Sequence, residues 1–181
     1  MLTLFLAPGF EEIEAITPID LCRRAGLDVI TVGVGGKNIT GSHSITVEAD
    51  ISDGALDLSP ALQGVILPGG MPGSQNLAQS PAVEKTLRYC FDRNLLIAAI
   101  CAAPTVPGRL GLLRGKRAVC YPGYENQLDG AIFTDLPVVR DGQFITAKAA
   151  GAAADFALEI ITVLQGPDAA KKVSESIFLN H

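Results

Sequence analysis

Short apolar runs alternate with longer segments of helical periodicity along this chain of 181 residues. Runs rich in Leu, Ile and Val have the length of buried strands, and they lie at 2–6, 28–32, 64–67, 95–100 and 144–146. Apolar residues at helical spacing predict helices at 13–25, 81–91, 101–113, 152–164 and 168–176. Alternating polar and apolar residues at 43–47 predict an edge strand or a hairpin arm.

The run at 95–100 (LLIAAI) contains no polar residue, which is typical of a central strand covered by helices on both faces. The alternation of strands and helices predicts one α/β domain over residues 1–181, with a mostly parallel sheet and right-handed crossovers. Ligands of such sheets bind beyond the carboxyl ends of the strands. The residues that follow the strands at 2–6, 64–67 and 95–100 are therefore the candidates for chemistry.

Composition narrows the class of protein. Hydrophobic residues make up 48% and charged residues 18%, which excludes intrinsic disorder. The net charge of -5, without a run of Lys or Arg, argues against a nucleic-acid or membrane partner. The sequence contains no transmembrane-length apolar stretch, and its first residues do not resemble a signal peptide. Four Cys residues without paired spacing indicate free thiols in the cytoplasm, and only two His residues make a metal site unexpected.

The strongest local signal lies at Cys101, where the apolar strand ends and a helix is predicted to start without a loop. This arrangement is typical of a nucleophile elbow, which lifts a side chain above the sheet. A thiol at a helix N-terminus can have its pKa lowered to ~3.5–7.5. The small residue Ala102 lets backbone amides approach a ligand. The alternative, a buried structural cysteine, stays open at this point.

Glycines follow the strand at 64–67, in the stretch LPGGMPG. Gly69 and Gly70 can bring backbone N–H groups close to a bound oxygen, so they are candidates for an oxyanion or substrate-binding site facing Cys101. The alternative is an ordinary turn.

Three carboxyls, Glu11, Glu12 and Glu14, open the first predicted helix, where they complement the helix dipole. Glu11 and Glu14 share one helix face, while Ile13 and Ile16 are expected to point into the core. A carboxyl turned into an apolar crevice at the strand ends would have a raised pKa, and it would then exchange a proton with a thiol.

The remaining candidate residues carry weaker signals. His43 lies on the predicted hairpin and is expected at the surface, and His181 is the last residue of the chain. Cys22 and Cys90 lie on predicted amphipathic helices and are expected in the core. Cys120 is either a core thiol or part of a site.

Together these signals resemble the DJ-1/ThiJ/PfpI family. The similarity is carried by APGFEEIEAITPIDLCRRAG from Ala7, VILPGGMPGSQNL from Val65 and LIAAICAAPTVPGRLGLLRGK from Leu96, and it continues through TDLPVVRDGQFITAKAAGAAADFALEIITVLQG. The resemblance implies a flavodoxin-like, three-layer α/β sandwich related to class I glutamine amidotransferases. It also implies a homodimer, to which we expect the helix at 13–25 to contribute.

The same resemblance assigns roles to individual residues. It makes Cys101 the reactive cysteine and Glu14 its partner, and it makes the amides of Gly70 and Ala102 the oxyanion donors. Many family members have a histidine where this chain has Tyr121, which cannot act as an imidazole base near neutral pH. We therefore expect Tyr121 to contact the substrate rather than to catalyse, and peptidase activity is not expected.

The family implies cofactor-independent glyoxalase III or deglycase chemistry on methylglyoxal or glyoxal and their adducts, without a metal. A nucleophile, a proton carrier and an oxyanion site are sufficient for that chemistry. The alternative is a non-enzymatic redox sensor, in which Cys101 is oxidised to a sulfinate held by protonated Glu14. A holdase chaperone is a third possibility that the family implies.

Overall fold

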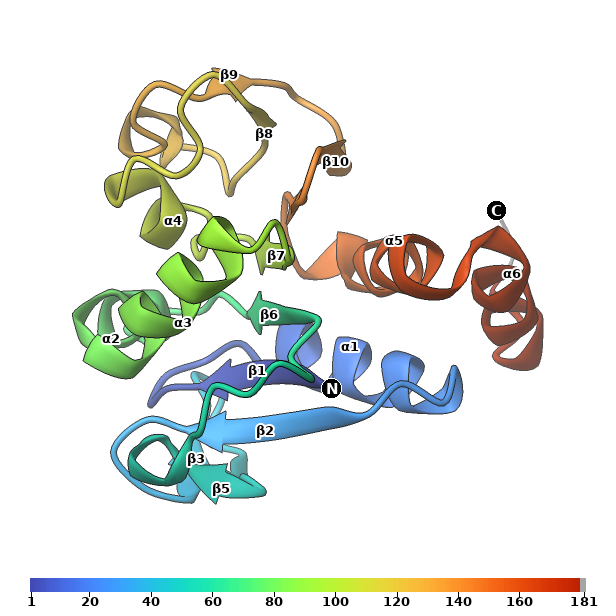
Figure 1. Cartoon of the computed structure of the whole chain (residues 1–181), viewed down its shortest axis with the longest axis horizontal. Helices are drawn as coiled ribbons and strands as arrows, with labels where there is room; N and C mark the ends of the chain where they lie inside the picture. The colour runs from blue at the N-terminus through green and yellow to red at the C-terminus, as the bar shows by residue number, and fades with distance from the viewer. Residues whose placement is uncertain (180–181) are drawn as a thin grey trace.

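The computed structural model describes residues 1–179, which fold around a seven-stranded sheet in the order β10–β11–β7–β6–β1–β2–β5 (Figure 1). All neighbouring strands in it are parallel except β10 and β11, which pair in the antiparallel sense. The order β2–β1–β6–β7–β11 is the flavodoxin-like one. The strands are β1 (Leu2–Leu6), β2 (Val29–Gly33), β5 (Ile51–Ser52), β6 (Gly64–Leu67), β7 (Leu96–Ile100), β10 (Val138–Asp141) and β11 (Phe144–Ala147).

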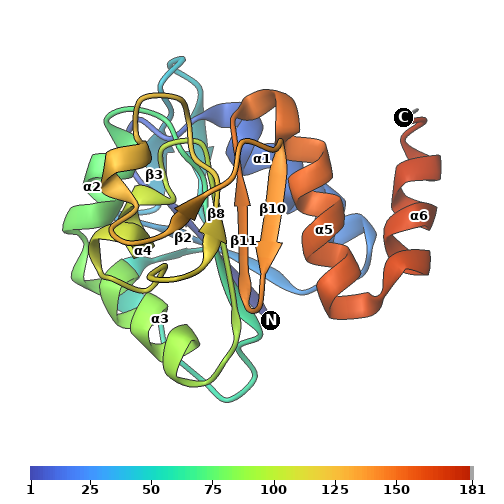
Figure 2. The same ribbon diagram turned by 90° about the horizontal axis from the view of Figure 1, so that it is seen from above.

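Helices cover both faces of the sheet, so the fold has three layers (Figure 2). On one side lie α1 (Glu12–Arg24) and α5 (Ala153–Gln165), with α6 (Pro167–Ser176) packed outside α5. On the other side lie α2 (Gly73–Gln79), α3 (Pro81–Asp92) and α4 (Thr105–Arg109). The two helix layers explain why the central strands β6 and β7 contain no polar side chain.

Each face of the sheet has its own core, because successive strand residues point to opposite faces. Leu4 and Leu6 of β1 belong to the core that Phe156 and Ile160 of α5 complete. Phe5, between them, belongs to the other core, with Val83 and Leu87 of α3.

Shorter elements complete the described chain. The remaining strands are β3 (Asn38–Thr40) and β4 (Thr46–Glu48), which form an antiparallel hairpin, and β8 (Arg117–Ala118) and β9 (Ile132–Phe133), which pair in parallel. The 3-10 helices are η1 (Asp53–Ala55), η2 (Glu125–Gln127) and η3 (Ala150–Ala152). The predicted parallel sheet and hairpin are thus confirmed, while His181 lies outside the described residues.

The helix predicted at 101–113 is wrong in its extent. Residues from Cys101 to Pro104 form turns, and the helix runs only from Thr105 to Arg109. Pro104 and Pro107 have no backbone N–H to donate, so this segment lacks the hydrogen bonds of a longer helix.

The expectation that Ile13 and Ile16 enter the core is also wrong, since they are 55% and 42% exposed. Ala15 and Ile19 of α1 are buried instead, and Glu12, one turn before Ala15, lies on their stripe. The two isoleucines share their stripe with exposed, charged residues further along the helix, Asp20 and Arg24.

The described helices are short, and the longest, α1 and α5, have 13 residues each. None of the helices within residues 1–179 is long and apolar enough to cross a membrane.

Candidate active site

The site lies where the order of the strands reverses. The chain passes from β1 to β2 on one side and then adds β6 and β7 on the other side of β1. In open parallel sheets this reversal opens a crevice beyond the carboxyl ends of the strands. The residues after β1, β6 and β7 meet there: Glu14 in the first turn of α1, Gly69 and Gly70, and Cys101.

Cys101 adopts a backbone conformation that lifts its side chain out of the sheet. Its φ angle is +66°, in the left-handed region that residues other than glycine rarely adopt. Hydrogen bonds hold it on both sides, because its N–H donates to the Ala147 carbonyl at 2.8 Å and its own carbonyl accepts from Tyr121 N at 2.8 Å. Cys101 is therefore fixed in an elbow, with its side chain half-buried in the crevice.

Glu14 is the buried partner of this thiol, with only 1% of the residue exposed. Its carboxyl is hydrogen-bonded to the Cys101 side chain, and its Oε2 accepts from Gly69 N at 2.9 Å. The backbone of Ala150 contributes a further hydrogen bond to it. Glu11 caps α1 by accepting from Glu14 N at 2.7 Å, so the helix end itself holds Glu14 in position.

Gly69 allows the carboxyl and the thiol to meet. A Cβ atom at this position would lie 2.5 Å from Glu14 Oε2 and 2.7 Å from Cys101 Cβ, closer than such atoms approach. Because the N–H of Gly69 is committed to Glu14, the donors left for a substrate oxygen are other amides. The N–H groups of Gly70 and Ala102 form hydrogen bonds to the Cys101 sulfur, and their role as oxyanion donors stays a prediction.

The expectation of a lowered thiol pKa is wrong. The pKa of Cys101 is raised to about 12, and burial is the largest cause. The carboxylate of Glu14 also raises this pKa, and its effect is larger than the opposite effect of the amides of Ala102 and Gly70. The helix dipole gives little help, because α4 starts four residues later and is only 5 residues long.

The pKa of Glu14 is raised to about 7, and burial is again the largest cause. The charge of Glu11 also raises this pKa, whereas the hydrogen bonds from Cys101 and Gly69 lower it. The two side chains titrate as a coupled pair. Above neutral pH the pair holds one proton, which lies on the thiol or on the carboxyl. Within the pair, the thiolate forms only when this proton moves to Glu14.

The other cysteines differ from Cys101. Cys22, Cys90 and Cys120 are fully buried, and burial raises their pKa values to about 12, 12 and 11. Cys22 and Cys90 are core thiols, as expected, and Cys120 joins the core beneath α3 and α4. All four are free thiols.

Tyr121 lies beside Cys101 through its backbone, which donates to the Cys101 carbonyl. Its ring is 46% exposed and packs edge-on against Tyr124, with the ring centroids 6.3 Å apart. A contact between this ring and a substrate stays a prediction.

A second polar cluster lies at the start of α1, and the sequence analysis missed it. His43 Nδ1 and Glu12 Oε2 are 2.8 Å apart, and Glu11 Oε1 lies 3.9 Å from the same nitrogen. The hydrogen bond with Glu12 raises the pKa of His43. The pKa of Glu12 is lowered overall. Burial alone would raise it, but the hydrogen bonds from His43 and Ile45 have the larger combined effect.

Glu11, Glu12 and His43 together have the side-chain types that bind a metal, within 4.8 Å of one another, although Glu12 and His43 are engaged with each other. Only the folding of the β3–β4 loop onto α1 brings them together.

Comparison with known proteins places this geometry in a family. The model of the DJ-1/PfpI family matches residues 2–163. The chain belongs to the DJ-1/PfpI family. It is similar to Parkinson disease protein 7 homolog of Danio rerio, with 35% identity over 97% of this chain and 95% of the relative. It is also similar to protein dj-1beta of Drosophila melanogaster, with 37% identity over the same shares.

Solved structures of DJ-1 proteins share the fold. The crystal structure of Drosophila melanogaster DJ-1beta superposes with a TM-score of 0.94 at 36% identity, covering 99% of this chain and 98% of the other. Oxidized Toxoplasma gondii DJ-1 gives a TM-score of 0.94 at 31% identity, with the same coverage.

The raised pKa of Glu14 makes stability depend on pH. Native Glu14 keeps its proton to about pH 7, whereas the unfolded chain loses it near the ordinary value of 4.5. Between these values the native state binds more protons, so its free energy of unfolding falls as pH rises, by ~3 kcal/mol in all. Glu14→Gln removes this group, so the variant should gain stability relative to the wild type across this range, as measured by urea unfolding. A stability difference that does not change with pH would contradict the shift.

Alkylation should distinguish the four thiols. Cys101 is the only one that is not fully buried, so iodoacetamide should label it first. Glu14→Gln removes the charge that opposes the thiolate and should speed labelling at pH 8 by ~10-fold, the effect of one pKa unit. Mass spectrometry of each cysteine measures the rates, with Glu84→Gln, an exposed carboxyl on α3, as the control. Faster labelling of Cys120 would contradict the order expected from burial, and no effect of Glu14→Gln would show that the pair is not coupled.

Proposed function

We propose that the protein is a cofactor-independent enzyme of the glyoxalase III or deglycase type. Its substrates are methylglyoxal or glyoxal and their adducts, and Cys101 and Glu14 do the chemistry. The observation that carries the proposal is the hydrogen bond between a half-buried thiol and a buried carboxyl whose pKa is about 7. Such a carboxyl both takes and gives a proton at neutral pH.

The first step forms a carbon–sulfur bond. Glu14 takes the proton of Cys101, and the thiolate attacks the aldehyde carbon of methylglyoxal. The oxygen of that carbon becomes an alkoxide, which the N–H groups of Gly70 and Ala102 stabilise. Protonated Glu14 then returns its proton to this oxygen, which gives a hemithioacetal and leaves Glu14 as a carboxylate.

The second step is an internal redox reaction. Glu14 removes the proton from the former aldehyde carbon and delivers it to the neighbouring carbon, while the hydroxyl proton passes to the neighbouring oxygen. The first carbon is oxidised to a thioester, and the ketone carbon is reduced to an alcohol. Water then cleaves the carbon–sulfur bond and releases lactate and the free thiol, so no external oxidant or reductant is needed.

Substitution of the pair tests this mechanism. Cys101→Ser should abolish lactate formation from methylglyoxal, because it removes the nucleophile. Glu14→Gln keeps a hydrogen-bond donor but cannot carry a proton, so kcat should fall by ~10²–10⁴-fold. Progress curves of lactate formation measure both effects, with Glu84→Gln as the control. A wild type that turns over neither methylglyoxal nor glyoxal, with Cys101 reduced, would overturn the proposal.

The same variants separate the enzyme from a redox sensor. A sensor needs only peroxide to oxidise Cys101 to a sulfinate, and a donor beside it to hold the sulfinate. Glu14→Gln retains that donor, so it should still form the sulfinate while losing turnover. We place the proposed activity in the cytoplasm, where four free thiols stay reduced.

We also infer that the protein is a homodimer. The exposed Ile13 and Ile16 form an apolar stripe on α1, and exposed Ile45 lies on the adjoining loop, where its N–H reaches the Glu12 carboxylate. Exposed apolar residues that gather in this way mark interfaces. The family resemblance supports the same conclusion.

A charge on this stripe should separate the subunits. Ile16→Glu places a carboxylate where an apolar contact is expected, so the species in sedimentation at micromolar concentration should shift toward 18.9 kDa. Leu136→Glu, at an equally exposed leucine outside α1, should leave the assembly unchanged. An 18.9 kDa wild type would refute the dimer, and a dimeric Ile16→Glu variant would place the interface elsewhere.

A further inference from the structure

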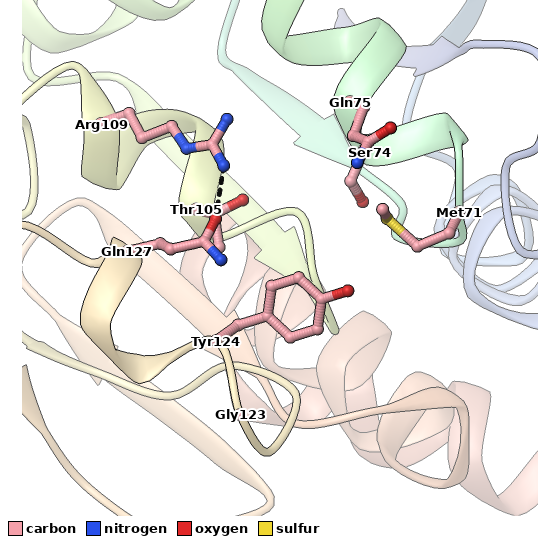
Figure 3. A pocket seen from close by; sticks show the side chains of 8 residues that line it. All are labelled: Met71, Ser74, Gln75, Thr105, Arg109, Gly123, Tyr124 and Gln127. Atoms are coloured by element: carbon pink, nitrogen blue, oxygen red, sulfur yellow. Dashed lines mark hydrogen bonds between the residues drawn. The ribbon is translucent and has the colours of Figure 1, made fainter.

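A cavity of about 390 Å³ opens beside the candidate site, between α2, α4 and η2 (Figure 3). Pockets of ~300–1,000 Å³ are the usual size for small ligands. Six of the residues that line it have polar side chains: Ser74, Gln75, Thr105, Arg109, Tyr124 and Gln127. Cys101 is not among the lining residues, so the cavity is a neighbour of the reactive centre rather than the centre itself.

The loops that hold Cys101 also form the walls of this cavity. Met71, at one edge, directly follows Gly70, whose N–H is hydrogen-bonded to the thiol. The hydroxyl of Thr105 donates to the Ala102 carbonyl at 2.7 Å. The third wall is linked to Cys101 through Tyr121, whose carbonyl accepts from Tyr124 N at 3.2 Å. These three links connect the walls of the cavity to the residues that hold Cys101.

Among the described residues that line the cavity, Arg109 is the one that carries a charge. Within residues 1–179 no carboxylate forms an ion pair with it, and its Nη2 donates to Gln127 Oε1 at 2.5 Å. A guanidinium has five N–H donors, so most of its hydrogen-bonding capacity remains for a ligand. Figure 3 shows Arg109 and Gln127 together on one wall.

Ser74 supplies an independent sign of a ligand. Its residue is only 4% exposed, and its hydroxyl is one of two buried side-chain groups within the described residues that lack a hydrogen-bond partner. A buried hydroxyl without a partner is unfavourable unless something else satisfies it. Figure 3 shows Ser74 on the wall opposite Arg109, beside the flexible thioether of Met71.

We propose that this cavity binds the carboxylate of a 2-oxoaldehyde whose aldehyde carbon reacts at Cys101, with Arg109 as the charge partner and Ser74 as a further donor. The inference rests on the proposed function. It narrows the substrate class from small neutral dicarbonyls to anionic ones. One guanidinium balances one negative charge, so a carboxylate fits this wall better than a doubly charged phosphate.

A matched pair of substrates tests the proposal. The anion 4,5-dioxopentanoate and its neutral methyl ester share the same 2-oxoaldehyde, so the ratio of their kcat/KM values reports the carboxylate contact. The wild type should favour the anion, and Arg109→Met should lower that ratio by about 10- to 100-fold, the effect of one hydrogen bond between charged groups. Ser74→Ala should lower it less. Arg93→Met, which removes a guanidinium that lies over the Tyr89 ring, should leave the ratio unchanged.

A binding measurement separates this proposal from the reaction itself. The unreactive 4-oxopentanoate retains the carboxylate and the ketone, and an NMR titration should detect its binding to the wild type but not to Arg109→Met. If no dicarbonyl is turned over but this binding persists, the proposed reaction fails and the carboxylate site stands. Equal kcat/KM values for anion and ester, binding of 4-oxopentanoate that survives Arg109→Met, or tighter binding of inorganic phosphate would each overturn the carboxylate site.

Discussion

The arrangement of the site depends on one proton shared between the buried carboxyl of Glu14 and the thiol of Cys101. Removing Glu14 from water raises its pKa to about 7, which turns an ordinary acid into a proton carrier at neutral pH. The same desolvation makes a free thiolate at Cys101 unfavourable unless the carboxyl holds the proton. Each side chain therefore influences the protonation state of the other.

The fold supplies the conditions for this pair. The strand order reverses at β1, so the carboxyl ends of β1, β6 and β7 open onto one crevice. The left-handed backbone of Cys101 lifts the thiol into it, and the absence of a side chain at Gly69 lets the carboxyl approach. The strained backbone of Cys101 and the missing Cβ of Gly69 thus both serve to bring the thiol and the carboxyl together.

Two further features of the surface are explained by the same crevice. Burying Glu12 and Glu14 turns Ile13 and Ile16 of α1 outward, where they form the apolar stripe that we assign to a second subunit. The neighbouring cavity, between α2, α4 and η2, carries the positive charge of Arg109. Chemistry and selectivity would then belong to different residues, with Glu14 and Cys101 reacting and Arg109 selecting.

The sequence by itself determined five of the seven strands of the main sheet, most helices and the parallel arrangement, because runs such as LLIAAI are typical of a strand covered on both faces, while β5 and β10 were not predicted. Positions after strand ends also indicated Cys101 and Gly70, whereas Glu14 was singled out among three neighbouring carboxyls only by the family resemblance. Tertiary structure alone decided which stripe of α1 is buried, where α4 begins and how the thiol titrates. Those outcomes depend on desolvation and on contacts between segments far apart in the chain, such as Glu14 with Gly69, and local spacing carries no information about either.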